Sequence, residues 1–118
     1  MTNARLEHVN ITVRDAAASA ALYCKLFDWD IRWHGAAMAG GTTYHVGGPD
    51  SYLALYSRGG TGRAPDSYKT PGALNHIGIT VDDLEACAAR VREAGFTPRD
   101  AADYEPGRRF YFDAPDGI

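Results

Sequence analysis

The stretch LEHVNITV at residues 6–13 returns as LNHIGITV at residues 74–81. The two copies share Leu, His, Ile, Thr and Val at the same places, and each runs on into an Ala-rich segment that begins near Asp15 or Asp83. Because there are only two copies and they lie far apart, we interpret them as two half-domains that pack together, not as a solenoid. The duplication puts one histidine, His8 or His76, at the same place in each half.

The first half has the pattern of a βαβββ module. Residues 6–13 alternate and are rich in β-branched side chains, which predicts a strand. Asp15 is a good N-cap for a helix over residues 15–28, where apolar residues recur at helical spacing. Three further short strands are predicted at residues 30–36, 41–47 and 51–58, with Gly- and Pro-containing turns between them.

The second half repeats this order. It predicts a strand at residues 74–81, a helix from Asp82 or Asp83 to Ala94, and strands at residues 97–102 and 108–113. Residues 41–50 align with residues 107–116, so the duplication extends through both halves. The fourth strand of this half would only be starting at Ile118. We therefore expect either a fold without that strand or a sequence that has been clipped.

The predicted organisation is a single domain of residues 1–118. Module 1 covers about residues 5–58, a Gly- and Pro-rich linker covers residues 59–73, and module 2 covers about residues 74–118, with its last strand incomplete. A chain of 118 residues with 45% hydrophobic content is large enough to hold a core without disulfides. We expect Cys24 and Cys87, which have no CxxC spacing, to be reduced and partly buried.

The composition excludes several kinds of partner. The formal net charge is -3, the pI is about 5.7 and the basic residues are scattered, which argues against nucleic-acid binding. No apolar run approaches the length of a membrane-spanning helix, and a strand-like sequence follows the N-terminus at once, where a signal peptide would have its apolar core. We therefore expect a cytoplasmic protein whose partner is a small molecule.

The repeated His strands, the helix start at residues 83–85 and the segment FDAPDG at residues 112–117 together resemble the vicinal oxygen chelate superfamily. That superfamily includes glyoxalase I, extradiol dioxygenases, fosfomycin-modifying transferases and bleomycin-resistance proteins. The resemblance covers the whole chain. It implies an α+β fold in which two tandem βαβββ modules form a curved mixed sheet around a cleft.

The resemblance also implies a metal site. In the family, residues on the first and last strands of each half hold a divalent ion that chelates vicinal oxygens of the substrate. The first-strand positions match His8 and His76, but residues 52–56 contain no carboxylate, imidazole or amide. The implied function is a metal-dependent lyase, isomerase or dioxygenase with Zn, Mn, Fe or Ni. The residues leave open a structural role for both histidines.

The alternative is a metal-free protein that sequesters a ligand, as bleomycin-resistance proteins do. If Tyr52, Ala54 and Tyr56 face inward, they line an apolar pocket suited to a flat ligand. Arg108 and Arg109 are adjacent, so alternation sends one of them inward. We take Arg109, with Tyr111, as candidates for substrate contact, and a salt bridge at the rim stays the competing interpretation.

Three further expectations complete the sequence-based interpretation. His34 and His45 are weaker candidates, expected to be exposed or incidentally hydrogen-bonded. Glu105 and Asp113 are possible acids or bases, although Asp113 precedes a Pro turn, where a carboxylate usually bonds backbone amides. Members of the superfamily commonly dimerise, so we expect a homodimer.

Overall fold

The structure is a computed structural model that describes residues 3–60, 62–104 and 107–118. It divides into two compact units, residues 1–61 and residues 62–118, which we describe separately. Within the described residues no helix is long and apolar enough to cross a membrane. Glu105 lies outside the described residues.

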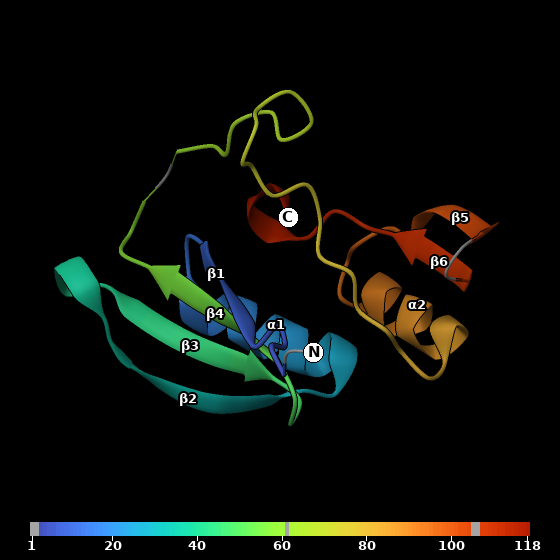
Figure 1. The fold of residues 1–118 in the computed structure, drawn as a ribbon. Helices are drawn as coiled ribbons and strands as arrows, with labels where there is room; N and C mark the ends of the chain where they lie inside the picture. The colour runs from blue at the N-terminus through green and yellow to red at the C-terminus, as the bar shows by residue number, and fades with distance from the viewer. Residues whose placement is uncertain (1–2, 61, 105–106) are drawn as a thin grey trace. The chain divides into compact units, whose positions relative to one another are not determined.

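The first unit is the predicted βαβββ module (Figure 1). Its elements, in chain order, are β1 (His8–Thr12), α1 (Ala16–Phe27), β2 (Asp30–Ala36), a 3-10 turn (Met38–Gly40), β3 (Thr42–Gly47) and β4 (Tyr52–Ser57). The strands form one sheet in the order β1-β4-β3-β2. β1 is parallel to β4 and the other pairs are antiparallel. The sheet is therefore mixed, as predicted.

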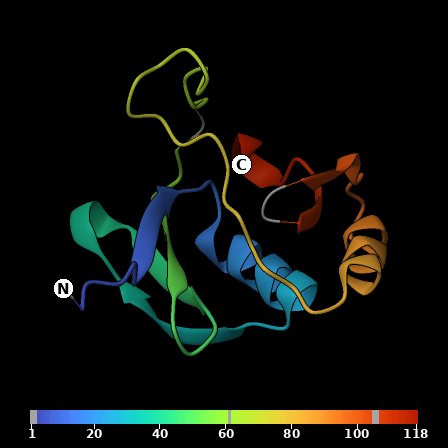
Figure 2. The same cartoon turned by 45° about the vertical axis from the view of Figure 1, so that its right-hand side comes forward.

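Helix α1 covers one face of this sheet (Figures 1 and 2). The Asp15 side chain caps it by accepting a hydrogen bond from the Ala18 N–H at 3.0 Å. The buried residues of the helix recur at helical spacing and include Ala16, Ala20, Tyr23 and Leu26. Val46 and Leu55, which are fully buried, face them from β3 and β4. The core of the unit therefore lies between α1 and the sheet.

The second unit contains α2 (Leu84–Glu93), β5 (Arg99–Tyr104), β6 (Gly107–Tyr111) and a 3-10 turn (Pro115–Gly117). The helix starts as α1 does, because the Asp83 side chain accepts a hydrogen bond from the Ala86 N–H at 3.0 Å. It ends just before Gly95, whose φ of 94° lies in the left-handed region, as predicted for a glycine after a helix. β5 and β6 form an antiparallel pair.

One predicted strand of the second unit is wrong. Residues 74–81 have no strand assignment, although Ile77, Ile79 and Val81 are half-buried and alternate with exposed residues, as in β1. In the first unit, β1 pairs only with β4. The described residues of the second unit contain equivalents of β2 and β3 but none of β4. Without that partner the backbone groups of residues 74–81 have no neighbouring strand to bond.

Candidate functional site

The face of the first sheet that α1 leaves uncovered is the candidate site, and we call it the open face. Leu53 and Leu55 point toward α1, so alternation places Tyr52, Ala54 and Tyr56 on the open face. The parallel register pairs His8 with Tyr52, Asn10 with Ala54 and Thr12 with Tyr56. Paired residues lie on the same face of a sheet, so His8 shares the open face with both tyrosines.

A row of stacked rings runs across the open face. The His8 and Tyr52 rings lie 4.8 Å apart at an interplanar angle of 10°. Tyr52 also stacks on His45 at 4.6 Å, and His45 contacts the Trp33 ring at 5.2 Å. Because β4 lies between β1 and β3, the two imidazoles reach Tyr52 from opposite sides. The four rings, which come from four different strands, form one continuous aromatic surface.

A β-bulge in β2 brings Trp33 and Arg32 to this surface. Ile31 pairs with Val46 and Trp33 pairs with the next residue of β3, His45, so Arg32 is an extra residue in the strand. A bulge of this kind can re-aim a side chain. The Arg32 guanidinium carbon lies 4.5 Å from the centre of the Tyr52 ring, and its Nη1 donates to the Gly48 carbonyl at 3.3 Å.

Polar contacts fix the orientation of three rings of the open face, those of His8, Tyr52 and Tyr56. Glu7 Oε1 lies 2.9 Å from His8 Nδ1 and accepts a long, 3.5 Å hydrogen bond from the Tyr52 hydroxyl. The Tyr56 hydroxyl donates to the Met38 carbonyl at 2.7 Å. The aromatic surface is therefore largely preformed, which reduces the conformational entropy lost when a ligand binds.

The surroundings of His45 favour its neutral form. Burial lowers the pKa of its imidazole below the ordinary 6.5, and electrostatic interactions with His8 and Arg32 lower it further, while Glu7 has the opposite effect. A neutral imidazole stacks on an aromatic ring without the desolvation cost of a charge.

We expect the first unit to lose stability as the pH falls below about 6.5, the ordinary pKa of histidine. Because the folded pKa of His45 is depressed, the unfolded chain takes up the proton first, and the stabilisation present above that pH is lost as the pH falls through the folded pKa. Urea unfolding at about pH 7.5 and about pH 5.5 measures the difference. His45→Gln should reduce it; an unchanged pH dependence in that variant would contradict the assignment.

The second unit brings three of the predicted site residues together. The His76 ring meets the Tyr111 ring edge to face, with centroids 5.9 Å apart. Arg109 and Tyr111 are two residues apart in β6, so they share a face, and Arg109 donates from Nε to the Gly107 carbonyl at 3.3 Å. In the alignment of the two halves, Tyr111 corresponds to His45 and Arg109 corresponds to Thr43. The candidate residues Arg109 and Tyr111 of β6 therefore lie on the strand face that corresponds to the open-face side of β3.

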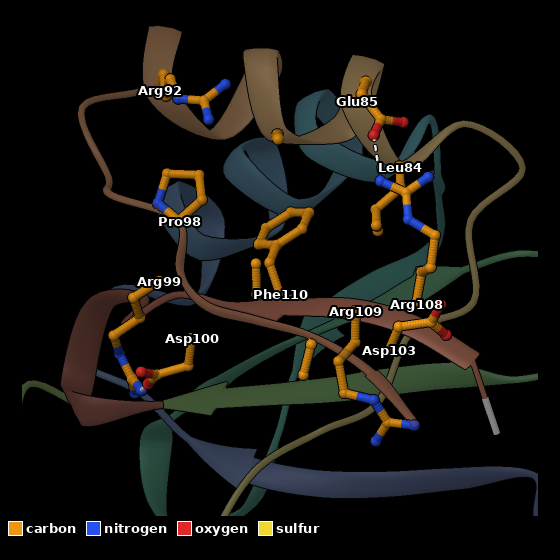
Figure 3. Close-up of a pocket in the computed structure, with 13 residues that line it drawn as sticks. Leu84, Glu85, Arg92, Pro98, Arg99, Asp100, Asp103, Arg108, Arg109 and Phe110 are labelled. Atoms are coloured by element: carbon orange, nitrogen blue, oxygen red, sulfur yellow. Dashed lines mark hydrogen bonds and ion pairs between the residues drawn. The ribbon is translucent and has the colours of Figure 1, made fainter. Parts of the chain in front are cut away.

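The adjacent arginines point in opposite directions, as predicted (Figure 3). Arg108 forms an ion pair with Glu85 of α2, whereas Arg109 points away from that helix. Asp113, which was expected to bond backbone amides, instead pairs with Arg99 at 2.9 Å, and this pairing lowers the pKa of the Asp113 carboxyl. Arg99 also pairs with Asp100.

A pocket of about 650 Å³ lies between α2 and the β5–β6 pair, with Phe110 pointing into it (Figure 3). Its apolar lining includes Leu84, Ala88 and Phe110. In the alignment of the halves these correspond to Ala16, Ala20 and Tyr44, which lie on the helix side of the first sheet. The pocket thus occupies the core side of the module, and we take the open face as the better candidate site.

The described residues do not form a metal-ligand set by themselves. Among residues 3–60, 62–104 and 107–118, no group of three or more His, Cys, Asp or Glu side chains is placed to hold a metal ion. Ala54, whose register neighbours on the open face are Asn10 and His45, offers no donor atom. His8 lies in the first unit and His76 in the second.

Sequence reasoning missed two residues of the open face, Arg32 and Trp33, and gave His45 only as a weaker candidate. A stronger signal for His45 is present, because the alignment of the halves matches it with Tyr111, a candidate for substrate contact. No sequence signal marked Arg32 and Trp33, because regular alternation sends only one of two adjacent residues to a given face, and the bulge suspends that rule.

Comparisons with known proteins agree on one fold. A structure of a glyoxylase/bleomycin resistance protein/dioxygenase domain from Frankia sp. EAN1pec is 24% identical, with a TM-score of 0.82 over 99% of this chain and 94% of that chain. The trypanothione-dependent glyoxalase I of Leishmania major is 26% identical, with a TM-score of 0.72 over 98% and 82%. TnmS3, an antibiotic-binding protein from Streptomyces sp. CB03234, is 20% identical, with a TM-score of 0.70 over 99% and 92%.

A search of curated protein sequences finds no match. The model of the family described as "Glyoxalase/Bleomycin resistance protein/Dioxygenase superfamily" matches residues 5–118. The duplicated βαβββ pattern, the mixed sheet of the first unit and the matched helix caps of the two units agree with that match. The chain belongs to the glyoxalase/bleomycin resistance protein/dioxygenase superfamily.

Proposed function

We propose that this protein binds a small planar organic molecule on the open face of its first unit, as a ligand-sequestering member of the superfamily. The observation that carries the proposal is the row of four rings, in which His8, Tyr52 and His45 are stacked and Trp33 contacts His45 at a tilt of 54°. Trp33 is 51% exposed, so a flat ligand has an aromatic surface on which to stack. Aromatic rings favour offset stacking with other flat π systems.

The relatives support a ligand-binding role without fixing the ligand. TnmS3 is an antibiotic-binding protein with the same fold, which shows that this fold accommodates a bound organic molecule.

The proposal is tested by comparing two ligands of the same carbon skeleton. Titration of the protein with 2-naphthamide, followed by calorimetry and by tryptophan emission, should give clear binding. The saturated analogue, decahydronaphthalene-2-carboxamide, should bind at least several-fold more weakly because it cannot stack. Trp33→Leu should reduce the difference between the two ligands. Equal affinity for both, or no binding of either, would overturn the proposal.

The second candidate is a metal-dependent lyase, isomerase or dioxygenase acting on a substrate with vicinal oxygens. It is favoured by one observation, the presence of an imidazole at the same place in each half of the duplicated sequence. A divalent ion such as Zn, Mn, Fe or Ni would be the cofactor, and His8 and His76 would be two of its ligands.

If this second candidate is correct, His8→Ala and His76→Ala should each remove most of the bound divalent metal. His34→Ala is the matched control, because His34 stacks on Tyr44 at 4.8 Å and takes no part in the row of rings. The metal content of protein purified without chelator, measured by elemental analysis, gives the result. Metal-free wild-type protein, or an equal loss in all three variants, would exclude the metal role.

We also propose that the protein forms a homodimer. β2 lies at one edge of the first sheet and carries the exposed apolar residue Ile31, which a second chain could cover without blocking Trp33. Light scattering should therefore give a mass that falls toward that of the monomer, 12.8 kDa, on dilution. A monomer mass at every concentration down to the low micromolar range would contradict this expectation.

A further inference from the structure

Arg32 is an exposed arginine whose side chain is held in place by contacts on the open face. The Gly48 carbonyl and the Tyr52 ring hold its guanidinium on the open face. Among the residues that the structure describes, no carboxylate pairs with it. A guanidinium has five N–H donors in a planar fork, so most of them are left to bond a ligand.

The second unit also places an arginine beside an aromatic ring, and there a carboxylate of the same unit pairs with it, although by strand register Arg99 stands at the position of Trp33. Arg99, from the corresponding strand β5, lies 5.9 Å from the centre of the Tyr111 ring and pairs with Asp113 at 2.9 Å. In the alignment of the two halves, Asp113 corresponds to Gly47. The first unit thus has a glycine at the position from which the second unit supplies a carboxylate to its arginine.

Gly47 also has no room for such a side chain. A Cβ placed there would lie 2.3 Å from the Ser51 carbonyl oxygen and 2.7 Å from the Tyr52 Cα, which are both backbone atoms. The close approach of the chain on either side of the β3–β4 turn therefore requires glycine. The sheet therefore cannot supply a carboxylate to Arg32 from this position, and the guanidinium stays available to an anionic ligand.

We propose that the ligand of the open face is a planar aromatic anion, such as an aromatic carboxylate, whose ring stacks on Trp33 and whose anionic group pairs with Arg32. This inference rests on the proposed function and names its ligand class. Arg32 and Trp33 are consecutive, and the bulge directs both toward the same face, so one rigid ligand can reach both. A guanidinium and a carboxylate form paired, charge-assisted hydrogen bonds.

The other charges on the open face are compatible with an anionic ligand. Glu7 is the nearby carboxylate, and it is already engaged by His8 at 2.9 Å and by the Tyr52 hydroxyl. Glu7 and Arg32 approach Tyr52 at different atoms, because Glu7 meets the hydroxyl and the Arg32 guanidinium lies over the ring. The Glu7 carboxylate is thus already bonded, while an anion at Arg32 would lie next to a guanidinium.

The test compares 2-naphthoate with its neutral isostere 2-naphthamide by calorimetric titration of the full chain. Wild-type protein should bind 2-naphthoate at least tenfold more tightly, since a charge-assisted pair adds to the same stacking contact. Arg32→Gln should abolish the preference while leaving the affinity for 2-naphthamide nearly unchanged. Arg32→Lys, which keeps the charge but loses the planar fork, should retain only part of it.

Lys25→Gln is the matched control. It removes the same charge from the last turn of α1, which covers the other face of the sheet, so the preference for 2-naphthoate should remain. Circular dichroism checks that each variant is folded. Equal affinity of wild-type protein for the two probes, or an unchanged preference in Arg32→Gln, would overturn the anion inference alone. Binding of neither probe at millimolar concentration would overturn the proposed function with it.

Discussion

Tyr52→Ala is expected to weaken the binding of 2-naphthamide by about 2 kcal/mol, a loss of about thirtyfold in affinity. Tyr52 is the central ring of the open face, because His8 stacks on one side of it and His45 on the other. Without the Tyr52 ring, both imidazoles lose their stacking partner. The aromatic surface that orients the ligand is then interrupted at its centre. Calorimetric titration measures the affinity, and circular dichroism confirms that the variant is folded.

Two further variants separate the contribution of the ring from a general loss of structure. Tyr52→Phe keeps the ring and removes only the long hydrogen bond to Glu7, so it should bind nearly as wild type does. His34→Ala removes a ring from the same sheet but outside the row, and it should leave the affinity unchanged. A Tyr52→Ala variant with wild-type affinity would show that the ligand does not lie on the open face.

Leu55→Ala should lower the free energy of unfolding of the first unit by about 2–5 kcal/mol, because it removes a large buried side chain and leaves a cavity. Leu55 is fully buried between β4 and α1. Typical small domains have only about 5–15 kcal/mol of stability, so this one change removes a large part of it. Both tryptophans, Trp29 and Trp33, belong to the first unit, so urea unfolding followed by tryptophan fluorescence reports on this unit.

Leu74→Ala provides the comparison for this experiment. Leu74 belongs to the second unit and is 51% exposed, so its truncation should change the fluorescence transition by no more than about 0.5 kcal/mol. A Leu55→Ala variant that unfolds at the wild-type urea concentration would show that β4 and α1 do not share a core.

The first half of the fold could be predicted from local sequence signals because each signal has a local physical cause. The side chains of Asp15 and Asp83 cap their helices. Each accepts a hydrogen bond from the backbone N–H three residues further along the chain. The alternation in β4 selects the face of every residue once Leu53 and Leu55 are assigned to the core. Such features depend on neighbours in sequence, and the sequence therefore predicts them.

The features that the sequence could not predict depend on partners elsewhere in the chain. Residues 74–81 carry the same strand pattern as β1, yet a strand also needs a neighbouring strand, and sequence alternation does not report whether one is present. The predicted bonding of Asp113 to backbone amides was wrong for a similar reason. Its observed partner, Arg99, lies on the other strand of the β5–β6 pair. Local turn chemistry competes there with a charge that only the fold brings near.

The bulge in β2 has an evolutionary consequence. Arg32 is the extra residue of that bulge, while Ile31 and Trp33 face consecutive residues of β3. Loss of the single codon for Arg32 would thus leave Ile31 and Trp33 in regular pairing and keep the aromatic row intact. β2 is an edge strand, where an insertion or deletion disturbs only one neighbouring strand. If Arg32 pairs with the ligand as proposed, the preference for charged over neutral ligands would change in a lineage by the gain or loss of this one residue, with no substitution elsewhere.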